Sequence, residues 1–212
     1  MNMNVSQADM QGLVNRLVRL ARLDTTVFDE VRLDASATVP SVIVAVVATF
    51  LAGFGGWLWW VMSSDFDTGS GQVLIKSAIL GSIFAIAMWV VWVLLVYVIL
   101  TQVFRAQADV QQLVRTMGMA AAPLGLTILM FIPGISFGIA LASVALFFGL
   151  STMAAQAATN APPAKVLVAS IAGFAVWAIV LTVLTGDVSI SRGGDLSINT
   201  YAPGIFIFSL GT

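Results

Sequence analysis

Five long apolar stretches, separated by short polar segments, dominate the hydropathy pattern of this chain. An α-helix needs about 20 residues to cross a hydrocarbon core about 30 Å thick, and in lipid its backbone groups must be satisfied within the helix. Four of the five stretches reach that length easily. The pattern therefore predicts an all-α membrane protein whose central domain, residues 39–186, is a five-transmembrane-helix bundle with spans at about 39–62, 73–104, 117–132, 135–157 and 166–185.

Residues 1–38 are too polar to span a membrane and predict a cytoplasmic segment. At 100° per residue, Asp9–Arg22 places its apolar side chains on one face and three arginines on the other. This pattern is typical of an amphipathic helix in the membrane interface, with its arginines near anionic headgroups. Packing of this helix on the spans or on a partner is an equally open interpretation. The three interfacial arginines are Arg16, Arg19 and Arg22.

Two further segments outside the spans have a predicted structure. Val27–Leu33 is expected to be a short helix with Asp24, Thr25 or Thr26 as its N-cap. The tail, residues 187–212, alternates apolar and polar residues on both sides of two glycines, which predicts a β-hairpin with Ile190 facing Ile198. Its apolar end is too short to span and is expected to dock on another surface.

The basic residues set the predicted orientation. With the N-terminus inside, seven arginines and lysines fall in cytoplasmic segments, whereas only Lys76 and Arg192 fall outside. Because cytoplasmic loops of membrane proteins carry an excess of Lys and Arg, we expect the N-terminus inside and the C-terminus outside. The seven are Arg16, Arg19, Arg22, Arg32, Arg105, Arg115 and Lys165.

Several uncharged residues in the spans predict interfaces. Tryptophans at the end of the first span indicate an aromatic belt at the membrane surface, and small residues spaced by four allow close approach of helices within the bundle or from a partner. Pro123 is expected to kink the third span, because proline cannot donate to the carbonyl four residues back. The belt residues are Trp57, Trp59 and Trp60, and the packing residues are Ala48, Ala52, Gly56, Gly134, Gly138 and Gly173.

The composition removes most chemistry. The chain has no histidine, no cysteine and a net charge of −1. It therefore lacks an axial ligand for haem, a thiol and a nucleophile–base pair, and nothing points to nucleic acid. No charged residue lies in 77–104, 116–164 or 166–186, which disfavours proton- or sodium-coupled transport. We expect no enzyme, no catalytic, cofactor-binding or metal-binding residue, and lipid or quinone contact by shape alone.

A series of local sequences resembles the bacterial branch of the Yip1-domain family over roughly residues 20–185. The most specific part is a Leu-x-Arg-x-x-Gly-x-Ala-x-x-Pro stretch, and Ile132-Pro133-Gly134 and Thr159–Lys165 follow in the same order. The resemblance implies five spans in the bacterial cytoplasmic (inner) membrane and no catalytic residues. The stretch comprises Leu113, Arg115, Gly118, Ala120 (or Ala121) and Pro123.

These features favour a non-catalytic scaffold or accessory subunit that packs against membrane lipids and other integral membrane proteins. An energy-transducing complex, respiratory or photosynthetic, is one assembly it would suit, and a homo-oligomer is also open. The alternative is a small-solute or lipid permease that uses the kinked third span. A permease predicts a polar cavity lined by Thr127, Ser136, Ser143 or Ser170, whereas a scaffold predicts hydroxyls bonded to carbonyls of their own helix.

Overall fold

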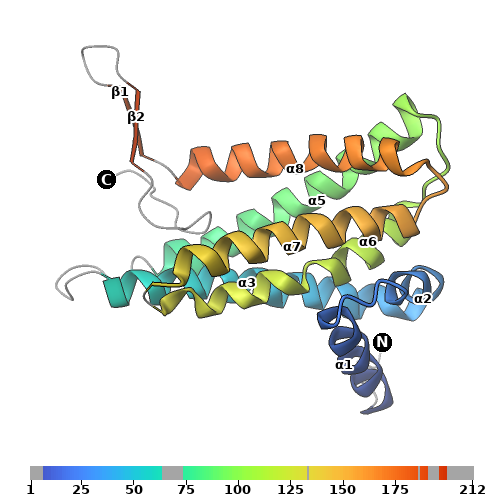
Figure 1. Ribbon diagram of the computed structural model, residues 1–212, viewed down its shortest axis with the longest axis horizontal. Coiled ribbons are helices and arrows are strands. Elements are labelled where there is room, and N and C mark those ends of the chain that lie inside the picture. The colour runs from blue at the N-terminus through green and yellow to red at the C-terminus, as the bar shows by residue number, and fades with distance from the viewer. Residues whose placement is uncertain (1–6, 64–73, 133, 186, 191–195, 200–212) are drawn as a thin grey trace.

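The computed structural model describes residues 7–63, 74–132, 134–185, 187–190 and 196–199. In this part of the chain five helices are long and apolar enough to cross a membrane, which confirms the expectation of five spans. They run along the long axis of the molecule (Figure 1). The spans are Ala35–Trp59, Ala78–Val103, Val110–Phe131, Ser136–Ala157 and Pro163–Leu181.

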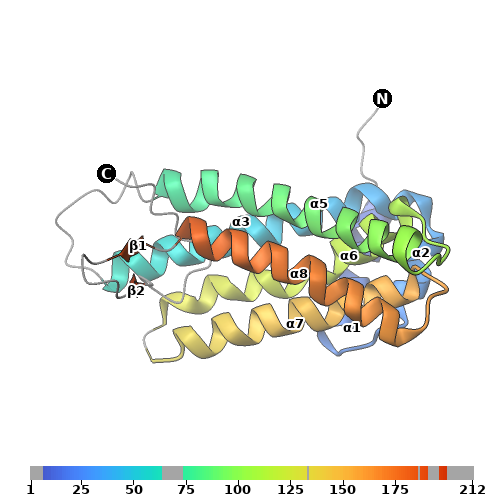
Figure 2. The ribbon, with the colours of Figure 1, turned by 90° about the horizontal axis from the view of Figure 1, so that it is seen from above.

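The spans form a closed ring that does not follow chain order. The first span, α3 (Thr38–Ser63), contacts the third, which contacts the fourth, α7 (Ser136–Ala157). From α7 the ring continues to the fifth, α8 (Pro163–Thr185), then to the second, whose main part is α5 (Ser82–Val98), and back to α3. Both ribbon views show this arrangement (Figures 1 and 2).

The third span is built differently from the others. It begins at α6 (Val110–Ala120) and continues as a long 3₁₀-helix, η4 (Ala122–Phe131). The helix therefore begins before the apolar run expected at about 117–132. A 3₁₀-helix rises about 2.0 Å per residue and an α-helix about 1.5 Å, so the two segments together reach about 36 Å and cross the core. This span is also the most buried, with 61% of its apolar window inside the protein.

Pro123 lies where α6 gives way to η4. Proline has no N–H, so the α-helical bond to the carbonyl of Met119 is lost. The following amide, of Leu124, donates instead to Ala121 O three residues back, at 3.0 Å. Pro123, which was predicted to kink the third span, thus marks the change from α-helical to 3₁₀ geometry.

The second span also changes its hydrogen bonding along its length. A π-helical segment, η2 (Ile75–Gly81), leads into α5, and a second one, η3 (Ile99–Val103), ends the span. The loop after it is tied to the loop before α8, because Gln107 N donates to Asn160 Oδ1 at 3.0 Å. The isolated β-bridge between Ala108 and Thr159 adds a second tie.

The N-terminal segment contains two helices of different character. Helix α2 (Val27–Leu33) has the bounds expected from the sequence, and it buries Val27, Phe28 and Val31 against the ends of the spans. A short 3₁₀-turn, η1 (Ala35–Ala37), joins it to α3. Helix α1 (Gln7–Ala21) runs across the direction of the spans and projects from the bundle (Figure 1).

The tail contains a two-stranded antiparallel ladder of β1 (Asp187–Ile190) and β2 (Leu196–Asn199). Its register differs from the expected one: Ile190 pairs with Leu196, and Ile198 pairs with Val188. The shift is two residues, so apolar residues still oppose apolar residues. The glycines of the expected turn and the apolar end of the tail lie outside the described residues.

Candidate functional site

Among the described residues, the charged side chains that form ion pairs or hydrogen bonds gather at one end of the bundle, where α2 and the 104–109 and 158–162 loops lie. We call this the α2 end. Arg115, on α6, is its most buried charge, with 7% of its surface exposed. Its guanidinium donates to Thr38 Oγ1 (2.7 Å), to the backbone oxygen of Arg32 (3.1 Å) and to Gln111 Oε1 (3.2 Å). No ion pair to Arg115 occurs among the described residues, so neutral oxygens hold this cation.

The partial negative charge at two helix C-termini stabilises the guanidinium groups of Arg32 and Arg115 at the α2 end. Arg115 donates to a carbonyl in the last turn of α2, and Arg32 Nη1 donates to Ala157 O, in the last turn of α7, at 3.0 Å. The C-terminal carbonyls of a helix carry partial negative charge, which favours a cation there. Asp29 lies 3.3 Å from Arg32 Nε and balances its charge. The two side chains therefore tie α2 to α3, α6 and α7.

The motif that carries the family resemblance has a packing role in this structure. Leu113 and Ala120 are fully buried, and Arg115 makes the contacts described above. Gly118 allows α6 to press on α3, since a Cβ there would lie 2.8 Å from Ser41 O. Pro123 starts η4. The motif thus holds the third span against the first.

Two of the three arginines predicted to lie in the membrane interface contact carboxylates of the N-terminal segment. Arg16 pairs with Asp34 at 2.8 Å, while Arg19 pairs with Asp24 at 2.8 Å and with Glu30 at 2.6 Å. These pairs join α1 to α2 and the turn between them. Arg22 is exposed. Two of the three arginines expected at lipid headgroups are therefore engaged with carboxylates of the chain itself.

These contacts also shift the ionisation of the carboxyls in the N-terminal segment. Hydrogen bonding from Ser36, followed by that from Arg16, lowers the pKa of Asp34 below its ordinary value. Hydrogen bonding from Thr26, followed by that from Arg19, lowers the pKa of Asp24. The pKa of Arg19 is raised, first by Asp24 and then by Glu30. The directions of all three pKa shifts show that these contacts favour the charged forms of the side chains, and these charged forms join α1 to α2.

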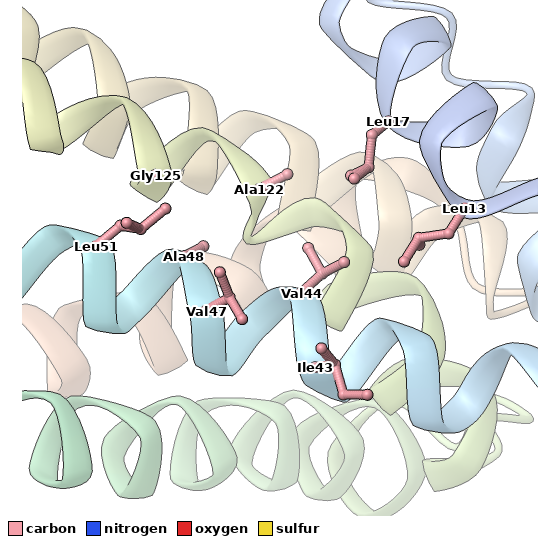
Figure 3. A pocket seen from close by; sticks show the side chains of 9 residues that line it. All are labelled: Leu13, Leu17, Ile43, Val44, Val47, Ala48, Leu51, Ala122 and Gly125. Carbon is pink, nitrogen blue, oxygen red and sulfur yellow. The ribbon is translucent and has the colours of Figure 1, made fainter. Parts of the chain in front are cut away.

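An apolar groove of about 290 Å³ lies between α1, α3 and the start of η4. Figure 3 shows Leu13 and Leu17 of α1 pointing toward α3 across this space. None of its nine lining side chains is polar. No local sequence pattern predicts this groove, because its walls come from three separate segments. The lining residues are Leu13, Leu17, Ile43, Val44, Val47, Ala48, Leu51, Ala122 and Gly125.

Helix α7 presents a line of small residues on its outer face, which we call the α7 seam. Gly138, Ala142 and Ala145 are exposed, and Gly149 is partly exposed. At offsets of 0, 4, 7 and 11 residues from Gly138, the four residues fall within about 60° of one another around the helix. A Cβ on Gly138 or Gly149 would meet no described atom within 4 Å. The seam is therefore open to a helix from outside this chain.

The small residues predicted from the sequence fall into two groups. Ala48, Ala52 and Gly56 are buried in α3, and so is the adjacent Gly55, whose Cβ would meet Thr127 O. Gly173 packs on Trp92. In contrast, Gly134 and Gly138 are exposed; Gly134 is a turn residue with φ +86° that precedes α7. The α7 seam extends C-terminally from Gly138, and its missed members are Ala145 and Gly149.

An aromatic cluster occupies the interface of α5, α7 and α8. Trp92 meets Phe147 edge to face at a centroid distance of 5.1 Å and lies 5.3 Å from Phe174. The indole nitrogen of Trp92 has no hydrogen-bond partner among the described residues. The cluster comprises Trp92, Phe147, Phe148, Phe174 and Trp177. Of the predicted belt, Trp57 and Trp59 are half-buried near the far end of α3, and the side chain of Trp60 lies outside the described residues.

The four hydroxyl groups expected to line a polar path in a permease have three different environments. Thr127 donates to Leu124 O, and Ser143 donates to Ile139 O at 2.7 Å, so both bond to their own helix. Ser170 is buried without a hydrogen-bond partner in the described part of the chain. Ser136 is partly exposed at the start of α7. The groove described above is lined by none of the four.

Among the described residues, no group of three or more His, Cys, Asp or Glu side chains could hold a metal ion. Comparisons with family models, with curated proteins and with solved structures found no match for this chain.

Proposed function

We propose that this chain is a non-catalytic membrane scaffold or accessory subunit that binds another integral membrane protein through the α7 seam. The observation that carries this proposal is the open line of Gly138, Ala142, Ala145 and Gly149 on a helix that crosses the membrane. In lipid, helices associate mainly by close packing, because lipid tails are as apolar as leucine. Small residues on an outward face therefore favour a partner helix.

The surroundings of the seam support the same reading. Large apolar side chains flank it, among them Phe137 and Leu141, which are 69% and 59% exposed. A partner helix can place its side chains between these ridges and approach the α7 backbone at the small residues. Of the five spans, α7 has the lowest buried share in its apolar window, 28%.

The proposed orientation places the α2 end in the cytoplasm of a bacterial cell, as the distribution of Lys and Arg predicts. Helix α1 then lies in the cytoplasmic interface, because its exposed stripe of Met10, Val14 and Val18 is apolar and it runs across the spans (Figure 1). The Yip1-like motif, with its packing role, is consistent with a structural protein. A complex of the respiratory or photosynthetic type remains one suitable assembly for it.

The permease alternative has less support. Thr127 and Ser143 bond to their own helices, and the groove at α1 is apolar. A solute path needs polar groups that face a water-filled space. Ser170, which is buried without a hydrogen-bond partner in the described part of the chain, is the one of these hydroxyl groups that departs from the pattern expected of a scaffold.

The test is purification of the tagged full chain from its native membranes in mild detergent, with mass spectrometry of the bound proteins. We expect one or two stoichiometric membrane partners, which are lost in Ala145→Leu and retained in Ala87→Leu. Ala87 is an exposed alanine on α5 and serves as the matched control. Retention of the partners in Ala145→Leu, or recovery of the wild-type chain alone, would overturn the proposal.

A further inference from the structure

The groove between α1, α3 and η4 remains open because α1 is held away from α3. Ion pairs of Arg16 and Arg19 fix α1 to α2 and to the turn before it. The turn itself is well defined: Leu23 has φ 60°, Leu23 N donates to Leu20 O and Asp24 N donates to Arg19 O, which is a Schellman arrangement. Helix α1 therefore cannot close onto α3 without breaking these bonds.

The groove opens on the outer side of a transmembrane span. Ile43 and Val47, two of its lining residues, are 47% and 49% exposed on α3. At 1.5 Å per residue, Ile43 lies about 12 Å and Leu51 about 24 Å from the start of the span at Ala35. Its floor is thus continuous with the exposed apolar surface of α3 and extends from near the start of the span toward its middle.

The size and the lining of the groove restrict its occupant. Water is disfavoured, since it needs two to four polar partners and the nine lining side chains supply none. The groove is open along one side, next to the exposed Ile43 and Val47 of α3, so its occupant enters from the surroundings of that helix. A hydrocarbon chain is narrow enough to enter, and left empty the groove would forfeit the dispersion contacts of its lining.

We propose that this groove is a binding site for one acyl chain of a membrane phospholipid, with α1 lying over the chain. The site selects by hydrocarbon shape and not by headgroup charge. Residues 7–34 contain four arginines and five carboxylates, and Arg16 and Arg19 are engaged within the chain. The proposal is independent of the α7 seam, which lies on a different span.

The test uses the full-length protein in phosphatidylcholine vesicles that contain a small fraction of phosphatidylcholine with a photoreactive diazirine on its acyl chain. After illumination, mass spectrometry locates the labelled residues. We expect Leu13 and Leu17 to be labelled more than Val168 and Ile179 of α8, although those two are 54% and 62% exposed. Vesicles of phosphatidylglycerol with the same acyl probe should give the same pattern.

Two variants fill the groove. A Cβ on Gly125 would lie 3.5 Å from Leu51 Cδ1, an ordinary contact, so Gly125→Leu extends into the space without forcing the backbone. Ala122→Leu is the second such variant. Both should lose the excess labelling of Leu13 and Leu17. Gly138→Leu, a change of the same size on the α7 seam, should keep it, which separates failure of this site from failure of the seam.

Three results would overturn the proposal. The first is labelling of Leu13 and Leu17 no greater than that of the α8 residues, and the second is excess labelling that survives both filling variants. The third is a disulfide-linked dimer of Leu17→Cys in the same vesicles, since the chain has no other cysteine and a second copy would then lie at the groove. Labelling confined to phosphatidylglycerol vesicles would replace shape selection by charge selection and contradict the site as stated.

Discussion

Two interfaces of the bundle bring helices together by different means. Between α3 and the third span, backbone meets backbone: Gly55 faces Thr127 O and lies where its Cβ would be 2.7 Å from Ile128 Cα, and Gly118 faces Ser41 O. Between α5 and α8, Gly173 faces the indole of Trp92, within the aromatic cluster. In the first interface the neighbour cannot move without moving a helix, whereas in the second it is a side chain.

This difference shows two ways in which uncharged side chains and backbone hold helices together in lipid. Where two backbones are close, dispersion and weak Cα–H···O contacts act over the length of the crossing, and any added atom is excluded. Where rings fill the interface, buried area and ring geometry supply the contact. Arg115 strengthens the first interface at the α2 end, since it bonds to Thr38 at the start of α3 from its place on α6.

The largest effect is expected for Gly55→Ala. Its new methyl group would overlap the backbone of Thr127 and Ile128, and overpacking of this kind costs about 3 kcal/mol when the neighbour cannot yield. Reversible unfolding in detergent micelles measures the loss. Gly138→Ala is the control and should be neutral or slightly stabilising, because its methyl group meets no described atom. Equal stability of the two variants would show that the α3 crossing is looser than described.

An intermediate effect is expected for Gly173→Ala, because its neighbour is the five-membered ring of Trp92. We expect a loss of about 1 to 2 kcal/mol in the same unfolding measurement, as the indole shifts within the aromatic cluster. The double variant Gly173→Ala, Trp92→Ala removes the ring atoms that overlap and should cost less than the sum of the two single variants. Strict additivity would contradict the assigned contact, and no comparable rescue exists at Gly55.

The smallest effect is expected outside both interfaces, at the ion pairs of α1. A carboxyl whose folded-state pKa is lowered stabilises the fold above its unfolded pKa, and this contribution is lost as the pH falls through the folded value. For Asp34 and Asp24 the ordinary value is 3.8, so the α1–α2 contact is intact at neutral pH and is lost on acidification below that value. Amide hydrogen exchange should then rise in α1 while α6 stays protected.

The control for the acidification experiment is Arg19→Gln at neutral pH. This variant removes the partner of Asp24 and Glu30 and should raise exchange in α1 in the same way. If α1 kept its protection in acid and in this variant, the ion pairs would not be what holds α1 away from α3.

Several elements followed from the pattern of residues alone. The five spans and the Val27–Leu33 helix could be predicted because length, hydropathy and apolar spacing are properties of a contiguous segment. The apolar run predicted as the third span is the C-terminal part of a longer helix. Its apolar run of 117–132 is short, and only the addition of α6 and the greater rise of η4 let it cross the membrane.

The roles of individual side chains were harder to predict. The arginines of α1 match an interfacial pattern, but the carboxylates that engage Arg16 and Arg19 come from α2 and the segments flanking it. Gly55, whose Cβ would meet the backbone of Thr127 and Ile128, was not named for packing, because a spacing of four does not show which residue faces another backbone. The groove has walls from α1, α3 and η4, which no local pattern connects.

The sequence by itself determined the class of this protein: five apolar helices, a polar N-terminal segment and a composition without histidine or cysteine. These follow from sums over a segment, and neighbours in space do not change them. The tertiary structure alone decided that the third span presses on the first, that the α7 seam stays open and that α1 stands over an apolar groove. Such outcomes depend on which helix faces meet. In lipid this is decided by how well the surfaces fit, because the surrounding lipid tails are as apolar as the helix surfaces themselves.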